Sequence, residues 1–132
     1  MVVIFDCNIW VTLTINSRID YIADLSNKGV IVAACANLRD EITTVLSRPK
    51  FNKFISASDI SDVIKLYDLA TRKYNLGKII SVTSDAKDDY LFALASKSKA
   101  DYLVTGDKLL LRVVNYKKTE IISLNRFKEI FR

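Results

Sequence analysis

The chain has 132 residues, half of them hydrophobic and 27% charged, which predicts one globular domain over residues 1–132 and excludes a disordered or fibrous chain. Its net charge of +5 favours an anionic partner, with nucleic acid as the first candidate. The absence of histidine, with only two cysteines, excludes Ser-His-Asp and Cys-His triads, His-ligated zinc and a structural zinc cluster.

The same sequence indicates an intracellular protein without a membrane anchor. No apolar run approaches the roughly 18 residues typical of a membrane span, and the first residues are typical of a buried strand rather than of a signal peptide. Cys7 and Cys35 lie beside apolar runs, and we expect both to be free thiols. The predicted location is therefore the cytoplasm.

Along the chain, β-rich apolar runs alternate with helical patterns. The runs are typical of strands buried on both faces: Val2–Phe5, Val30–Ala33, Lys78–Val82, Tyr102–Val104 and Glu120–Ile122. The helical patterns cover Ile19–Asn27, Leu38–Leu46, Ser61–Tyr74, Asp88–Lys97 and Arg126–Phe131. This alternation predicts an α/β fold, with a mostly parallel sheet of about five strands covered by helices on both faces. Ligands of such sheets bind beyond the carboxyl ends of the strands.

Two aspartates stand at that edge of the predicted sheet. Asp6 directly follows the first strand, and Asp107 follows the fourth within Val104-Thr105-Gly106-Asp107. Both side chains should therefore lie on the same edge of the sheet. The alternative is that each only caps the helix that follows, because Asp is a favoured N-cap residue.

Glu41 belongs to a helix whose apolar stripe contains Leu38, Ile42 and Val45, and helical spacing places Glu41 on that same inward face. No Lys or Arg lies three or four residues away along the chain. An inward carboxylate without a cation is costly unless something compensates its charge, and a bound metal ion would do so. The alternative is a position at the solvated margin of the stripe.

Asp88 and Asp89 differ in the face they are expected to occupy. At about 100° per residue, Asp88 falls on the helix face that carries Leu91 and Phe92, whereas Asp89 is predicted to point off that face. Asp85, three residues earlier, is expected to be the N-cap and to reach the site as a supporting residue rather than as a metal ligand.

Several acids in one crevice of a basic protein repel one another unless cations lie between them. Oxygen ligands without His or Cys suit Mg²⁺ or Mn²⁺. Such ions activate water and orient a phosphodiester, so nuclease chemistry would need no histidine.

The pattern as a whole resembles the PIN-domain family over nearly the entire chain. The similarity lies in Asp6-x-Asn8 after the first strand, the inward Glu41, the run DDYLFALA from Asp88, and ADYLVTGD ending at Asp107. Within the family, the chain is similar to the VapC-like toxin components of prokaryotic toxin–antitoxin pairs, a branch that the segment VLSRPKF also resembles.

The resemblance implies a three-layer α/β/α fold, Mg²⁺- or Mn²⁺-dependent RNA cleavage, a homodimer and a small antitoxin protein as partner. The acidic metal-binding and catalytic positions of the family correspond to Asp6, Glu41, Asp88 and Asp107. Asn8 and Thr105 correspond to supporting polar positions. The chain departs from the family at two positions: Cys7 stands where a hydroxyl residue is common, and Leu109 where another acid is frequent.

Four basic residues are candidate RNA contacts: Arg48, Lys50, Lys53 and Lys108. The first three lie in a segment that also contains Phe51 and Phe54, and a mixture of cations and aromatic rings suits phosphate contact and base stacking. The alternative is a solvated turn whose two phenylalanines belong to the core.

Other functions fit parts of this pattern. A housekeeping PIN nuclease in RNA processing, or a catalytically silent RNA-binding or assembly module, would share the fold. An aspartyl-phosphate phosphatase of the haloacid-dehalogenase type would use Asp6 as nucleophile, but such enzymes usually need a second Asp two residues later, where this chain has Asn8. A receiver-type phospho-switch needs an acceptor Asp directly after a central strand, which neither of two predicted strands, Val30–Ala33 and Lys78–Val82, provides.

Overall fold

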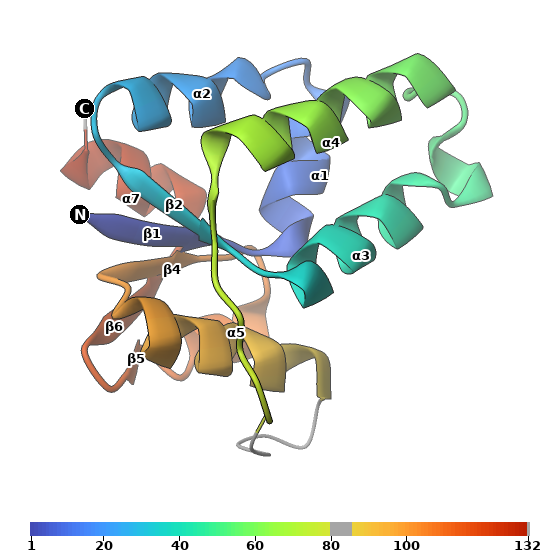
Figure 1. Ribbon diagram of the computed structural model, residues 1–132. Coiled ribbons are helices and arrows are strands. Elements are labelled where there is room, and N and C mark those ends of the chain that lie inside the picture. Colours follow the sequence, from blue (N-terminus) through green and yellow to red (C-terminus); the bar gives the residue numbers. More distant parts are fainter. Residues whose placement is uncertain (80–85, 132) are drawn as a thin grey trace.

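The computed structural model describes residues 1–79 and 86–131 of the chain. Strands and helices alternate along most of it (Figure 1). The strands are β1 (Val2–Phe5), β2 (Ile31–Ala34), β3 (Arg72–Lys73), β4 (Tyr102–Val104), β5 (Asn115–Tyr116) and β6 (Thr119–Ile122). The helices are α1 (Cys7–Ile15), α2 (Asp20–Asn27), α3 (Ala36–Leu46), α4 (Ala57–Ala70), α5 (Ala86–Ser98), α6 (Lys108–Leu111) and α7 (Leu124–Ile130), with a short 3₁₀ turn at Pro49–Phe51.

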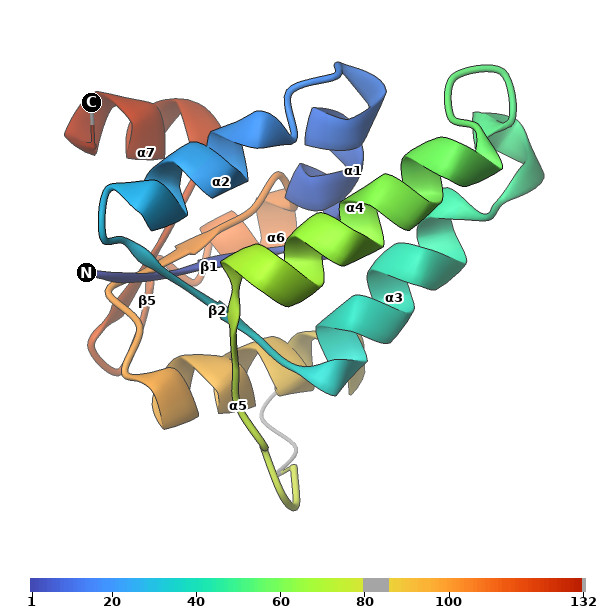
Figure 2. The same cartoon turned by 45° about the horizontal axis from the view of Figure 1, so that its top comes forward.

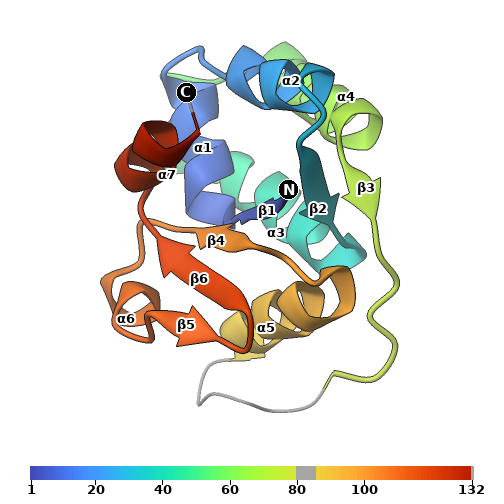
Figure 3. The ribbon, with the colours of Figure 1, turned by 90° about the vertical axis from the view of Figure 1, so that its left-hand side faces the viewer.

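The described strands form a six-stranded sheet in the order β3-β2-β1-β4-β6-β5. All neighbours pair in parallel except β5, which runs antiparallel to β6 at one edge. Figure 3 shows the sheet crossing the molecule, with α1 and α7 on one side and α5 on the other. The predicted three-layer α/β/α architecture with a mostly parallel sheet is therefore confirmed.

β1 and β4 lie at the centre of the sheet because their sequences, VVIF and YLV, are apolar on both faces. Val3, Ile4 and Phe5 are fully buried, as are Leu103 and Val104 of β4. Helices on both sides of the sheet exclude water from these strands, which suits their near-continuous apolar character.

Helices α3 and α4 form a pair beside the sheet (Figure 2). α3 packs against α1, α4 and α5, while α4 also contacts α2. α4 begins with a capping box in which Ser56 and Asp59 satisfy each other's backbone N–H groups. α2 ends at Asn27 and is followed two residues later by Gly29, whose φ of 88° is a conformation that glycine adopts without strain.

Several predicted boundaries are confirmed, one helix ends earlier than predicted, and one predicted strand is absent at the two of its residues that the structure describes. The first and fourth strands begin and end where the sequence placed them. The helix expected over Ser61–Tyr74 instead ends at Ala70, because the chain turns at Thr71 to pair Arg72–Lys73 with β2. The strand expected at Lys78–Val82 is not formed at Lys78 or Ile79, and its remaining residues lie outside the described ones.

None of the described helices is long and apolar enough to span a lipid bilayer. Cys7 and Cys35 are both buried free thiols, as expected.

Candidate functional site

The carboxyl ends of the central parallel strands bring two of the predicted site residues to one edge of the sheet. Phe5, the last residue of β1, is paired with Val104, the last residue of β4. The pairing continues one step further, because the backbone N–H of Asp6 donates to the carbonyl of Val104 at 2.9 Å. Asp6 and Thr105 therefore leave the sheet side by side.

Asp6 both caps α1 and faces a cavity. Its Oδ1 accepts a hydrogen bond from the backbone N–H of Cys7 at 2.7 Å, and its Oδ2 accepts one from the Thr105 hydroxyl at 2.7 Å. The residue is only 7% exposed. The capping interpretation and the site interpretation of Asp6 are thus compatible, because the residue caps α1 through Oδ1 and also lines a cavity.

Thr105 and Asn8 connect Asp6 to Asp107. The fully buried Thr105 hydroxyl accepts from the backbone N–H of Asp107 at 3.0 Å while donating to Asp6. The Asn8 side-chain amide lies within 3.5 Å of the Asp6 carboxylate, and its oxygen accepts from the backbone N–H of Gly106 at 3.1 Å. Asp107, like Asp6, caps the helix that follows it, because its Oδ1 accepts from the backbone N–H of Leu109 at 2.9 Å.

Glu41 and Asp88 approach the same place from two helices, α3 and α5. Both residues are half-buried. The hydroxyl of Tyr90, two residues after Asp88, donates a hydrogen bond to Oε1 of Glu41. α3 and α5 are therefore joined across the site by a side-chain contact.

The four carboxylates line one cavity of about 450 Å³. Asp6 and Asp107 come from the strand ends, and Glu41 and Asp88 come from the helices. The cavity is also lined by apolar and polar neighbours of these acids, Cys7, Asn8, Val11, Thr12, Val45 and Leu91, and by Arg48 and Phe51 beyond α3.

Asp89 does not line the cavity, but it is buried, with 7% of its surface exposed. The helical-wheel argument assumed a single buried face, whereas α5 packs both against the sheet at β2 and against α3. Asp85, the predicted N-cap, lies outside the described residues.

Burial dominates the electrostatics of the cavity. The pKa of Asp6 is raised from 3.8 to about 6, chiefly by burial and to a smaller extent by the negative charges of Glu41 and Asp88, despite the opposing hydrogen bonds from Thr105 and Cys7. Burial also raises the pKa of the Tyr90 hydroxyl, as does its hydrogen bond to Glu41. Tyr90 therefore remains a neutral donor at any physiological pH.

The four acids line the same cavity, but their side chains are not close enough together to coordinate one metal ion. Within residues 1–79 and 86–131, no three Asp, Glu or Cys side chains lie close enough together to hold one metal ion. Outside the cavity, Lys and Arg side chains form ion pairs with Asp68, Asp101 and Glu129. Arg48 is the basic residue that lines the cavity together with Asp6 and Glu41 among the residues that the structure describes.

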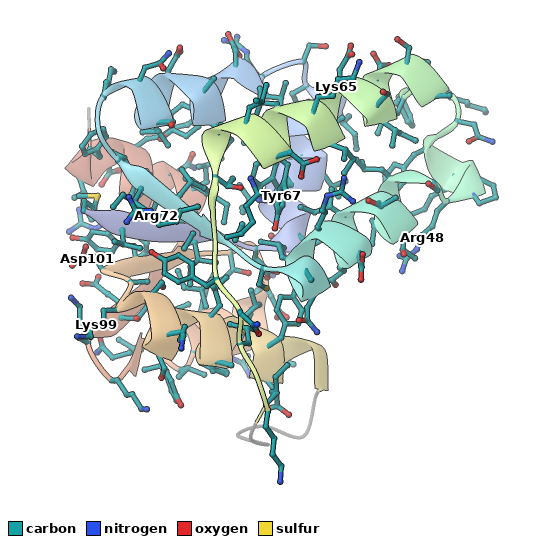
Figure 4. The ribbon with its side chains drawn as sticks, viewed as in Figure 1. Arg48, Lys65, Tyr67, Arg72, Lys99 and Asp101 are labelled. Carbon is teal, nitrogen blue, oxygen red and sulfur yellow. The ribbon has the colours of Figure 1, made fainter. Side chains whose placement is uncertain are left out.

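Of the four predicted RNA contacts, Arg48 alone lines the cavity, and it projects from the end of α3 (Figure 4). Lys50 lies over the ring of Phe51, with its Nζ 5.0 Å from the ring centre. Phe51 packs against the core and also lines the cavity, whereas Phe54 is 63% exposed. The alternative in which both phenylalanines belong to the core is therefore wrong for Phe54. Lys53 and Lys108 are exposed and do not line the cavity.

The sequence did not single out Tyr90. It stands two residues from Asp88, which places it on a different side of an ideal helix from that acid. Its contact with Glu41 depends on how α3 and α5 pack, and no spacing along the chain carries that information. A buried tyrosine needs a partner for its hydroxyl, and this was the only signal that pointed to such a contact.

Comparison with known proteins gives a consistent result. A family model described as PIN domain matches residues 2–109. Among solved structures, this chain is similar to VapBC2 from Rickettsia felis, which was crystallised bound to a DNA fragment from the VapBC2 promoter. The two superpose with a TM-score of 0.59 at 17% sequence identity. The superposition covers 92% of this chain and 98% of that one, so the two share a fold. No curated protein sequence matches this chain significantly.

Proposed function

Because this chain belongs to the PIN-domain family, we propose that it is a metal-dependent endoribonuclease that hydrolyses RNA phosphodiester bonds. The observation that carries the proposal is the convergence of Asp6, Glu41, Asp88 and Asp107 on one cavity at the carboxyl ends of the central strands. These acids come from four separate parts of the chain. Even in a protein of net charge +5, four carboxylates close together repel one another unless a bound cation compensates their charge.

The donor atoms fit a divalent ion of the Mg²⁺ or Mn²⁺ type. All four side chains offer carboxylate oxygens, which these ions prefer. The raised pKa of Asp6 supports the same inference, since burial disfavours its ionised form and a bound cation would stabilise that form. Without an ion, mutual repulsion favours separated carboxylates, which agrees with the absence of a ready-made cluster among the described residues.

Asp6, Glu41, Asp88 and Asp107 would hold the ion, which supplies a Lewis acid and an activated water for phosphodiester hydrolysis. The chain's own groups have separate tasks. Thr105 fixes the orientation of the Asp6 carboxylate through its hydroxyl. Arg48 at the cavity wall binds a substrate phosphate, and the partly exposed Phe51 ring offers a stacking surface for a base. Water is added across the P–O bond, and the products are a phosphate monoester and a hydroxyl.

The test is a cleavage assay on single-stranded and structured RNA. We expect the wild-type protein to cleave in Mn²⁺ and to stop when EDTA is added. Asp6→Asn should be inactive, whereas Asp24→Asn, which removes an exposed acid on α2, should cleave like the wild type. Cleavage that persists in EDTA or in Asp6→Asn would contradict the proposal.

We further propose that the nuclease is the toxin of a cytoplasmic toxin–antitoxin pair and that a small antitoxin protein blocks its cavity. The structural likeness to VapBC2 supports the same kind of assembly. Expression of the chain alone should then arrest bacterial growth, and Asp6→Asn should abolish the arrest. A housekeeping nuclease would cleave RNA in the assay without arresting growth.

A further inference from the structure

The hydroxyl of Tyr90 joins the two helices that supply Glu41 and Asp88. Tyr90 lies on α5 and is 5% exposed, and its hydroxyl donates to Oε1 of Glu41 on α3. Phenylalanine would fill the same apolar space without a hydroxyl to satisfy. The hydroxyl therefore matters through its contact with Glu41.

Glu41 has few other restraints. Its side chain is half-buried and lines the acidic cavity. Among the described residues, Tyr90 is the one hydrogen-bond donor to its carboxylate. A glutamate side chain has three rotatable bonds, and fixing them costs conformational entropy. A side chain that is already held binds a ligand without that cost at the moment of binding.

We propose that Tyr90 is a positioning residue that engages Oε1 of Glu41 and leaves the other carboxylate oxygen available to a divalent ion. The inference rests on the proposed function, because it assigns Tyr90 a role in the affinity of that metal site. Residues behind the metal ligands orient them in this way in many proteins, and losing such a partner typically weakens metal binding about 10- to 100-fold.

A purely structural role for Tyr90 makes a different prediction. If the hydroxyl only ties α5 to α3, its removal would lower the stability of the metal-free protein and leave metal affinity unchanged. If it positions Glu41, its removal weakens metal binding, and that effect disappears once Glu41 is gone.

The experiment is a titration with Mn²⁺ alone, with free Mn²⁺ measured by electron paramagnetic resonance. It uses the wild type, Tyr90→Phe, Glu41→Ala and the double variant. Tyr90→Phe should raise the Kd for Mn²⁺ about tenfold and should have no further effect in the Glu41→Ala background. Tyr21→Phe is the matched control, because it removes a buried hydroxyl from α2, outside the cavity lining, and should leave the Kd unchanged.

An unchanged or lower Kd in Tyr90→Phe would overturn the inference. So would a Tyr90→Phe effect that persists in full in Glu41→Ala, since it would then act through packing. Thermal unfolding in EDTA shows that each variant is folded at the temperature of the titration. A wild-type protein that binds no Mn²⁺ would instead overturn the proposed function itself, which distinguishes the two failures.

Discussion

Asp6 makes both a stabilising and a destabilising contribution to the fold. Its Oδ1 caps α1, which stabilises the helix, but the carboxylate is almost fully buried. The rise of its pKa from 3.8 to about 6 means that the ionised form is disfavoured in the folded protein. A shift of this size corresponds to roughly 3 kcal/mol of stability lost when the group is charged.

This cost has a defined pH dependence in the metal-free protein. Because the folded pKa lies above the unfolded one, the cost is absent below pH 3.8, grows as the pH rises toward 6 and is complete above it. Asp6→Asn retains a capping oxygen and removes the charge. In EDTA it should be more stable than the wild type by roughly 2 kcal/mol at pH 7.5, with a smaller advantage at pH 5. Urea unfolding at both pH values measures this, and an equal difference at both would contradict it.

Thr105 is the residue that couples Asp6 to Asp107. Its hydroxyl donates to the Asp6 carboxylate and accepts from the backbone N–H of Asp107. Thr105→Val should lower the free energy of unfolding by about 1–3 kcal/mol and also weaken Mn²⁺ binding. Thr119→Val is the control, since that buried hydroxyl donates to the carbonyl of Ala100, away from the cavity. It should cost stability alone, and an equal effect of both variants on the Kd would argue against the coupling.

At the scale of elements, the sequence correctly predicted the bounds of two strands in which an apolar run ends at a polar residue. β1 and β4 begin and end where their runs do, and the acids after them reach the same cavity because parallel strands end at one edge. Glu41 was placed by helical periodicity, since one stripe of α3 is buried.

The same reasoning failed where packing rather than local pattern decides the structure. β3 has only two exposed residues, Arg72 and Lys73, and exists because β2 offers an edge to pair with. α5 is buried on more than one side. Helical periodicity along α5 therefore could not predict that Asp89 is buried or that the Tyr90 hydroxyl donates to Glu41. Such contacts depend on the relative placement of whole helices.

Tyr67 makes a prediction about how α4 is attached. Its hydroxyl donates to the carbonyl of Cys35 at 2.9 Å and accepts from the backbone N–H of the same residue at 3.2 Å. It thereby satisfies the backbone between β2 and α3, and its ring is fully buried (Figure 4). Tyr67→Phe should lower the free energy of unfolding by roughly 2 kcal/mol, because it leaves the buried backbone N–H of Cys35 without its partner, whereas the Cys35 carbonyl keeps its bond from the backbone N–H of Arg39.

The control for Tyr67→Phe is again Tyr21→Phe. The buried hydroxyl of Tyr21 has no hydrogen-bond partner within the described part of the chain, so its loss should cost little. Chemical unfolding of both variants measures the difference. Equal stability losses would show that the Cys35 contacts contribute nothing specific.

At the scale of the whole molecule, the proposed partners are RNA, an antitoxin and a second copy of the chain. Several large apolar side chains are exposed, among them Leu69 on α4 at 88% and Leu109 on α6 at 68%. We expect light scattering during size-exclusion chromatography to give twice the mass of one chain. The mass of a single chain across micromolar concentrations would contradict a homodimer.

The central claim is that the four carboxylates of the cavity are a metal site, and anomalous X-ray scattering from crystals grown with Mn²⁺ tests it most directly. The account predicts an anomalous peak in the cavity, in contact with carboxylate oxygens from Asp6, Glu41, Asp88 and Asp107 and absent from crystals of Asp6→Asn. A cavity without a peak at saturating Mn²⁺, or a peak bound only by acids outside it, would contradict the claim.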